Sequence, residues 1–151
     1  MTLFDQISDD IKKAMLARNH AELEALRGIK KEFLEAKTAK GSNGDLSDEQ
    51  ALKILQKMAK QGKDAAALFV EQKRQDLADE YLAQVAVYER YLPKPMAPAE
   101  LEAAVRAIIE QVGAKSPQEM GKVMGVASKQ LAGKAEGRAI SETVKRILAS
   151  L

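Results

Sequence analysis

Apolar residues recur at steps of three and four along most of the chain, and this spacing predicts helices. The first apolar stripe runs from Leu3 to Met15, and a second follows Asn19. Asn19 and Glu22 form the capping signal that is typical of a helix start. No segment shows the strict alternation of apolar and polar residues that marks a half-buried strand. We therefore predict an all-α fold.

Two longer helices are predicted after a loop at residues 41–44, which has the sequence Gly-Ser-Asn-Gly. The first covers residues 47–74 and keeps its helical phase across Gly62, which weakens it by about 1 kcal/mol relative to alanine. The second covers residues 76–92. Together with the two preceding helices, they make the predicted N-terminal bundle.

Three shorter helices are predicted in the last third of the chain. They cover residues 98–112, residues 116–131 and residues 140–151. The second opens on Ser-Pro-Gln-Glu, a capping box in which serine and glutamate each satisfy a free backbone amide. The resulting picture is a compact three-helix tail.

Pro93 and Pro95 separate the two groups of helices, because proline lacks an amide and disfavours helical geometry in the residue before it. All three phenylalanines and all three tyrosines precede Pro93, so the two halves have different cores. We predict two helical subdomains, residues 1–95 and residues 96–151.

Several classes of chemistry are excluded by composition. The chain has no cysteine, which removes disulfides, thiolate nucleophiles and thiolate metal sites. His20 is the single histidine, so an HExxH zinc site is absent, and its place at a helix start suits a solvated residue. Neither GxSxG nor GxxxxGK[ST] occurs. We predict no catalytic residue, no metal and no cofactor.

Basic residues gather near the C-terminus. The whole chain has a net charge of +2, whereas residues 113–151 hold seven basic and three acidic residues. Lys115, Lys122 and Lys129 follow one another at intervals of seven, so we expect them to share a helix face. Such a surface is typical of contacts with nucleic-acid phosphates, and the alternative is a solvated helix face. The candidate RNA-binding residues are Lys122, Lys129, Lys134, Arg138 and Lys145.

Two glycines, Gly121 and Gly125, lie four residues apart on one side of a predicted helix, at a cost of about 1 kcal/mol each. Such a cost indicates that a neighbouring group packs closely against the helix backbone at these glycines. That group is either a helix of the same domain or an RNA backbone. No aromatic residue follows Tyr91, so this part of the chain cannot stack bases. Structured RNA, recognised by its backbone and shape, is the nucleic acid that remains.

Five motifs follow one another from Tyr91 onward. They are Tyr91-Leu92-Pro93, Gly113-Ala114, Met120-Gly121-Lys122-Val123-Met124-Gly125, Gly133-Lys134-Ala135-Glu136-Gly137-Arg138 and Val144-Lys145-Arg146-Ile147-Leu148. In this order they resemble the YqeY family. The resemblance runs nearly end to end, and the C-terminal part is similar to the tail domain of GatB, a subunit of the glutamine-dependent aspartyl/glutamyl-tRNA amidotransferase.

The resemblance implies an all-helical protein whose tail approaches the body of tRNA, and it carries the label of a carbon–nitrogen ligase with glutamine as amido donor. Two positions depart from the family pattern. Lys73-Arg74-Gln75 lacks the glycine expected between the third and fourth helices, and Glu136 stands where an aspartate cap is more usual.

Three functions follow from these observations. The first is a tRNA-associated accessory binding module without catalysis of its own. The second is a helical adaptor that docks on a protein through the N-terminal helices, using the apolar run from Ala65 to Val70. The third is an amidotransferase component that is active only with other subunits.

The expected location follows from the absence of a membrane-length apolar run and of a basic, apolar leader. The longest apolar run has six residues, whereas a membrane helix needs about 20. The sequence therefore predicts a cytoplasmic protein without a membrane span.

Overall fold

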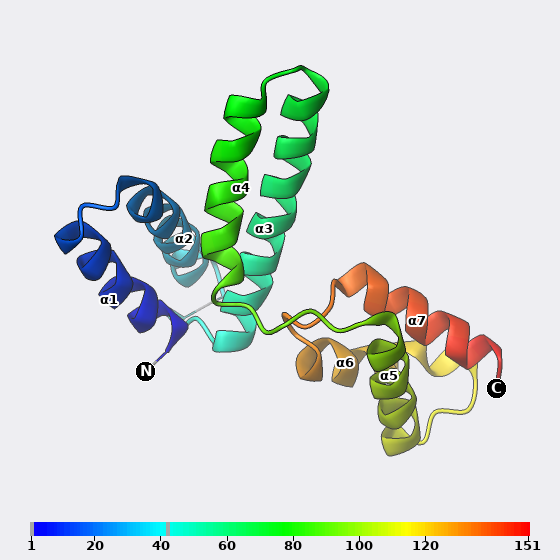
Figure 1. The fold of residues 1–151 in the computed structure, drawn as a ribbon. Coiled ribbons are helices and arrows are strands. Elements are labelled where there is room, and N and C mark those ends of the chain that lie inside the picture. Colours follow the sequence, from blue (N-terminus) through cyan, green and yellow to red (C-terminus); the bar gives the residue numbers. More distant parts are fainter. Residues whose placement is uncertain (1, 42) are drawn as a thin grey trace. The chain divides into compact units, whose positions relative to one another are not determined.

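The all-α prediction is confirmed by a computed structural model that describes residues 2–41 and 43–151. In these residues it contains seven α-helices, one 3₁₀ helix and no strand (Figure 1). Ser42, part of the predicted loop at 41–44, lies outside the described residues. In chain order the elements are α1 (Leu3–Leu16), α2 (His20–Thr38), α3 (Asp48–Glu71), α4 (Gln75–Glu89), α5 (Pro98–Val112), η1 (Pro117–Glu119), α6 (Met120–Gln130) and α7 (Gly137–Ala149).

The chain divides into two compact units, which we describe separately. The N-terminal unit ends at Leu92, and the C-terminal unit is Pro93–Leu151. Each unit has a hydrophobic core of its own. Pro93, the first residue of the predicted proline boundary, opens the second unit.

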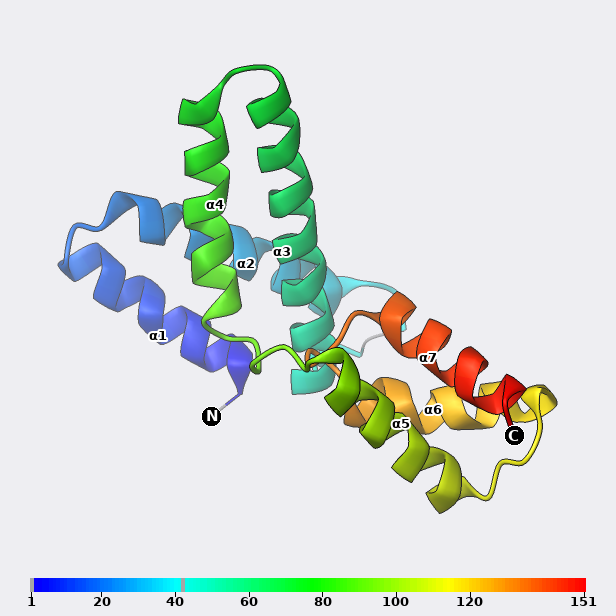
Figure 2. The same cartoon turned by 45° about the vertical axis from the view of Figure 1, so that its right-hand side comes forward.

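The N-terminal unit consists of two antiparallel helix pairs, α1 with α2 and α3 with α4 (Figures 1 and 2). Asn19 caps α2 and Ser47 caps α3, as predicted from their sequence signals. Both side chains accept a hydrogen bond from an amide of the first turn, which would otherwise lack a partner. The largest fully buried side chains of this core are Ile7, Leu26, Ile29, Phe33 and Leu55.

Gly62 lies in the middle of α3, where that helix meets α4. The helix is continuous through this glycine, as predicted. A Cβ atom at position 62 would lie 2.5 Å from Cγ2 of Val85, which is closer than a Cβ atom comes to a non-bonded neighbour in real proteins. The absence of a side chain at Gly62 therefore permits the close packing of α3 against α4.

The turn between α3 and α4 uses Lys73 where the family pattern led us to expect glycine. Lys73 has φ of 60°, in the left-handed region that glycine adopts most readily. Arg74 follows it, and its guanidinium group pairs with Asp76 at 3.0 Å. The helix boundary is therefore sharp although the turn has no glycine.

The C-terminal unit packs α5, α6 and α7 around a core without aromatic residues. Gly113 ends α5 with φ of 72°, as expected for a left-handed helix terminator. The capping box at Ser116 is present, but it opens η1, and α6 begins only at Met120. The fully buried residues of this core include Val105, Val123, Val144, Ile147 and Leu148.

Candidate nucleic-acid interface

The five candidate RNA-binding residues are all exposed and all belong to the C-terminal unit. Lys122 and Lys129 lie seven residues apart on one face of α6, or about 10 Å along the helix axis. Arg138 and Lys145 have the same spacing on α7, and Lys134 lies in the turn between the two helices. The candidates therefore form two pairs, one on α6 and one on α7, and Lys134 lies in the turn that connects these helices.

Lys115 does not share the face of Lys122 and Lys129. It lies in the loop between α5 and η1, where its backbone amide donates a hydrogen bond to Glu119. The predicted series of three lysines is therefore wrong at its first member, because the helix starts later than the periodicity indicates.

Gly121 and Gly125 are exposed on α6, beside the lysine row. Among the described residues of the C-terminal unit, no atom outside the backbone of α6 and the adjacent residues lies within 4 Å of a Cβ placed at either position. The neighbouring helix that we considered as occupant is therefore absent, and the two glycines leave an open, flat strip of backbone. We call Gly121, Lys122, Gly125 and Lys129 the glycine face.

The start of α7 has amides without a side-chain cap. Glu136 occupies the N-cap position, and its side chain makes no capping hydrogen bond. The departure from the family's aspartate therefore leaves the first-turn amides of α7 open to an acceptor from outside. Amides at a helix start bind anions well, since the helix dipole adds to their hydrogen bonds. Lys134 and Arg138 are close to this end in sequence, and both are exposed.

Among the described residues of the C-terminal unit, the ion pairs involve arginines and leave the candidate lysines without an acidic partner. Arg106 and Arg146 both pair with Glu102, at 3.0 Å and 3.6 Å, and their charges hold the pKa of that carboxyl below its usual value. Arg138 pairs with Glu142 at 3.1 Å in a solvent-exposed pair, which is worth about 0.5 kcal/mol or less. In the part of the chain that is described, none of the four candidate lysines makes an ion pair: Lys122, Lys129, Lys134 and Lys145.

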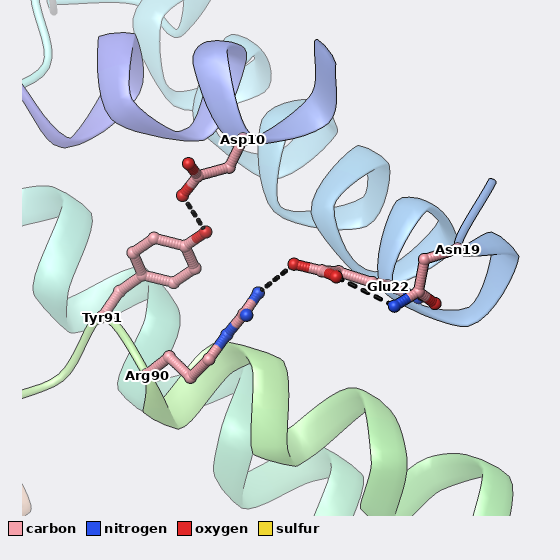
Figure 3. A network of polar contacts seen from close by, with 5 residues as sticks. All are labelled: Asp10, Asn19, Glu22, Arg90 and Tyr91. Carbon is pink, nitrogen blue, oxygen red and sulfur yellow. Dashed lines mark hydrogen bonds and ion pairs between the residues drawn. The ribbon is translucent and has the colours of Figure 1, made fainter. Parts of the chain in front are cut away.

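A second polar cluster lies in the N-terminal unit, where α1, α2 and the end of α4 meet (Figure 3). The Tyr91 hydroxyl donates to Asp10 at 2.5 Å, and the Arg90 guanidinium donates to Glu22 at 2.6 Å. Glu22 also accepts from the Asn19 amide group at 3.0 Å. Burial and the bond to Asp10 raise the pKa of Tyr91. Because these charged and hydroxyl groups are already paired, we interpret the cluster as a structural clamp.

Replacing Tyr91 by phenylalanine is expected to lower the free energy of unfolding by about 0.5–1 kcal/mol, because one hydrogen bond is lost from a half-buried site. Urea unfolding followed by far-UV circular dichroism measures this change. Asp10→Ala is the partner variant, and the effects of the two changes should not add, because both remove the same hydrogen bond. Additive losses would show that the bond contributes nothing.

The described residues contain neither a metal-binding cluster nor a membrane-spanning helix. No group of three or more histidine, cysteine or acidic side chains is placed to hold a metal ion in residues 2–41 and 43–151. Across that same part of the chain, no helix has the length and apolar character needed to cross a bilayer.

The chain is similar to known proteins along nearly its whole length. The family model described as Yqey-like protein, YqeY, matches residues 4–148. Among curated proteins, Altered inheritance of mitochondria protein 41 from Clavispora lusitaniae is 32% identical over 90 residues, which are 60% of this chain and 51% of that protein. The protein of that name from Kluyveromyces lactis is 29% identical over 85 residues, 56% of this chain and 45% of the relative.

A third protein of the same name, from Pyrenophora tritici-repentis, is 25% identical over 147 residues, covering 95% of this chain and 79% of the relative. The match thus spans about half the length of the first two relatives and most of the third. All three are named as mitochondrial proteins, which contradicts the cytoplasmic location that the sequence predicts. That prediction is wrong because its basis, the lack of an apolar leader, concerns secretion and gives no information about mitochondrial import.

Proposed function

Since the chain belongs to the YqeY family, we propose that it is an accessory module that binds structured RNA, tRNA in particular, through its C-terminal unit and without catalysis of its own. The contacts are made to the sugar-phosphate backbone. The residues that make them are Lys122, Lys129, Lys134, Arg138 and Lys145, together with the open amides at the start of α7.

The glycine face is the observation that carries this proposal. Gly121 and Gly125 each cost about 1 kcal/mol in a helix, and no close contact with the described residues of the C-terminal unit accounts for that cost. A backbone strip without side chains lets a bulky partner approach the helix closely, while Lys122 and Lys129 beside it supply charge. An RNA backbone needs both features, since it is bulky and anionic.

The C-terminal unit has no aromatic residue, and this indicates which class of RNA it binds. Its core and surface hold no aromatic residue on which an unpaired base could stack. Single-stranded RNA is bound mainly by such stacking, whereas double-helical RNA is bound by its shape, phosphates and 2′-hydroxyl groups. The resemblance of the tail to that of GatB supports tRNA within this class.

The test is the salt dependence of binding to folded tRNA. Affinity should fall steeply as salt rises, because each lysine or arginine that contacts a phosphate releases condensed counterions. Replacing Lys134 and Arg138 by glutamine should weaken binding about tenfold at low salt and flatten the log–log salt slope by about one unit per lost contact. Fluorescence anisotropy with labelled tRNA measures both quantities, and a single-stranded RNA of equal length should bind more weakly.

Lys12 and Lys13 provide the matched control, since both are exposed on α1 of the N-terminal unit and have no role in the proposal. Their replacement by glutamine should leave the salt slope unchanged. Equal losses from the two double variants would point to diffuse attraction by charge, and the absence of tRNA binding at low salt would refute the proposal.

A further inference from the structure

The outer part of the α3–α4 hairpin consists of two helices, and α2 reaches only its inner end, where His20 and Glu24 lie beside Asp79 and Glu80. The core of the N-terminal unit reaches α3 only as far as Ala59 and α4 only from Val85 onward. Beyond these residues the hairpin projects past α1 and α2, as both views show (Figures 1 and 2). We call residues 64–82 the outer hairpin.

The outer hairpin exposes large apolar side chains. Leu68, Val70, Tyr81 and Leu82 are 58%, 50%, 37% and 44% exposed. Phe69 stacks on the Tyr81 ring with centroids 5.5 Å apart, so the aromatic pair is preorganised on the surface. Single exposed apolar residues are ordinary, but four in one short hairpin indicate an interaction surface.

The base of the same hairpin shows how its apolar flank is covered. There α2 packs on both α3 and α4, with Leu26, Ile29 and Phe33 fully buried. Tyr81 lies seven residues, or about two helical turns, before Tyr88, which belongs to the core of the unit. The side of α4 that packs at the base of the hairpin therefore continues into the outer hairpin at Tyr81. An amphipathic helix is therefore the shape that would continue this packing beyond the reach of α2.

The charge of the outer hairpin indicates which kind of helix would bind there. The outer hairpin holds five carboxylates and two cations, a net charge of −3, and two more lysines, Lys60 and Lys63, precede it on α3. Lys63 is paired with Glu89 at 3.2 Å. One of the two cations in the outer hairpin, Arg74, is already paired with Asp76. Asp79 and Glu80 line a groove of α4 together with Glu24 of α2. A surface of this sign repels nucleic acid and attracts lysine and arginine.

We propose that the outer hairpin is the docking site for a basic amphipathic helix of a partner protein. The apolar face of that helix covers the Phe69–Tyr81 ring pair, and its lysines or arginines face Asp79 and Glu80. The resulting arrangement is a three-helix contact of the kind that α2 makes at the base of the hairpin. This surface is separate from the RNA-binding residues proposed for the C-terminal unit.

The absence of cysteine allows the site to be tested with one reactive probe. In the full chain, Leu82→Cys is labelled with a benzophenone maleimide, irradiated in an extract of native cells, and the cross-linked peptides are sequenced. We expect peptides from another protein that form a helix with lysine or arginine beside an apolar stripe. Adding Asp79→Lys and Glu80→Lys should lower their yield about tenfold, because like charges then face each other.

The matched control is the same label at Ala103, an exposed position of α5 in the other unit. Circular dichroism verifies folding, and Asp79→Asn with Glu80→Gln replaces the charge reversal if that variant does not fold. Cross-links from one copy of this chain to another, peptides without basic residues, yields equal to the Ala103 control, or yields unaffected by the charge changes would each overturn the proposal.

Discussion

Replacing Gly121 and Gly125 by leucine is expected to weaken tRNA binding about 100-fold and at the same time to stabilise the C-terminal unit. Leucine is a better helix former than glycine by about 0.8 kcal/mol per residue. In the described part of the C-terminal unit, nothing outside α6 itself lies within 4 Å of the first side-chain carbon, so this gain should appear in the free energy of unfolding. Binding suffers because two bulky side chains keep the RNA backbone away from α6. Thermal unfolding and fluorescence anisotropy measure the two effects.

This double variant distinguishes shape from charge, since Lys122 and Lys129 remain in place. The salt slope of the remaining binding should therefore change little. Ala103→Leu with Ala107→Leu is the matched control, because both alanines are exposed on α5. If the glycine variant binds tRNA as tightly as the natural chain, the glycine face is not an RNA interface. If it is less stable, the glycines have a packing role in the unit.

Gly62→Ala should have the opposite effect on stability, lowering the free energy of unfolding by up to about 2 kcal/mol. Alanine again gains about 1 kcal/mol of helix propensity. The added methyl group meets Val85 Cγ2 at 2.5 Å, however, and a β-branched valine that is 3% exposed has little freedom to move. Overpacking of this kind costs about 1–3 kcal/mol, so the clash should exceed the gain. Urea unfolding measures the net effect.

Gly28→Ala supplies the comparison within the same unit, since its Cβ would lie 4.0 Å from Met58 Cε, an ordinary contact. That variant should be more stable than the natural chain by about 1 kcal/mol. Combining Gly62→Ala with Val85→Ala tests the cause, because the loss in the double variant should be smaller than the sum of the two single losses. A simple sum would mean that Val85 is not what opposes a side chain at position 62.

The helix limits were predictable where their causes are local. Asn19, Ser47 and Gly113 cap or end helices through contacts with neighbours a few residues away, so the sequence signals were sufficient. The capping box at Ser116 was also correct, but short-range signals do not tell a 3₁₀ turn from the first turn of an α-helix. This ambiguity misplaced Lys115, which had been predicted on the helix face of Lys122.

Contacts between distant residues were not predictable in the same way. The bond between Tyr91 and Asp10 joins residues 81 positions apart, and no local pattern marks it. At Gly62 only a cost in helix propensity is predictable from the sequence, and the reason for that cost is the contact with Val85 of α4. Gly121 and Gly125 carry the same cost without any neighbour. A glycine in a helix therefore predicts that another group packs closely against it. The sequence does not tell whether that group belongs to the same chain or to a binding partner.

The separate cores have a spectroscopic consequence. Tyr81, Tyr88 and Tyr91 all lie in the N-terminal unit, and the chain has no tryptophan, so the C-terminal unit contributes no intrinsic fluorescence. Tyrosine emission therefore reports the melting of the first unit alone, whereas helical ellipticity at 222 nm reports both. The difference between the two normalised melting curves isolates the optically silent unit, without a label and without cutting the chain.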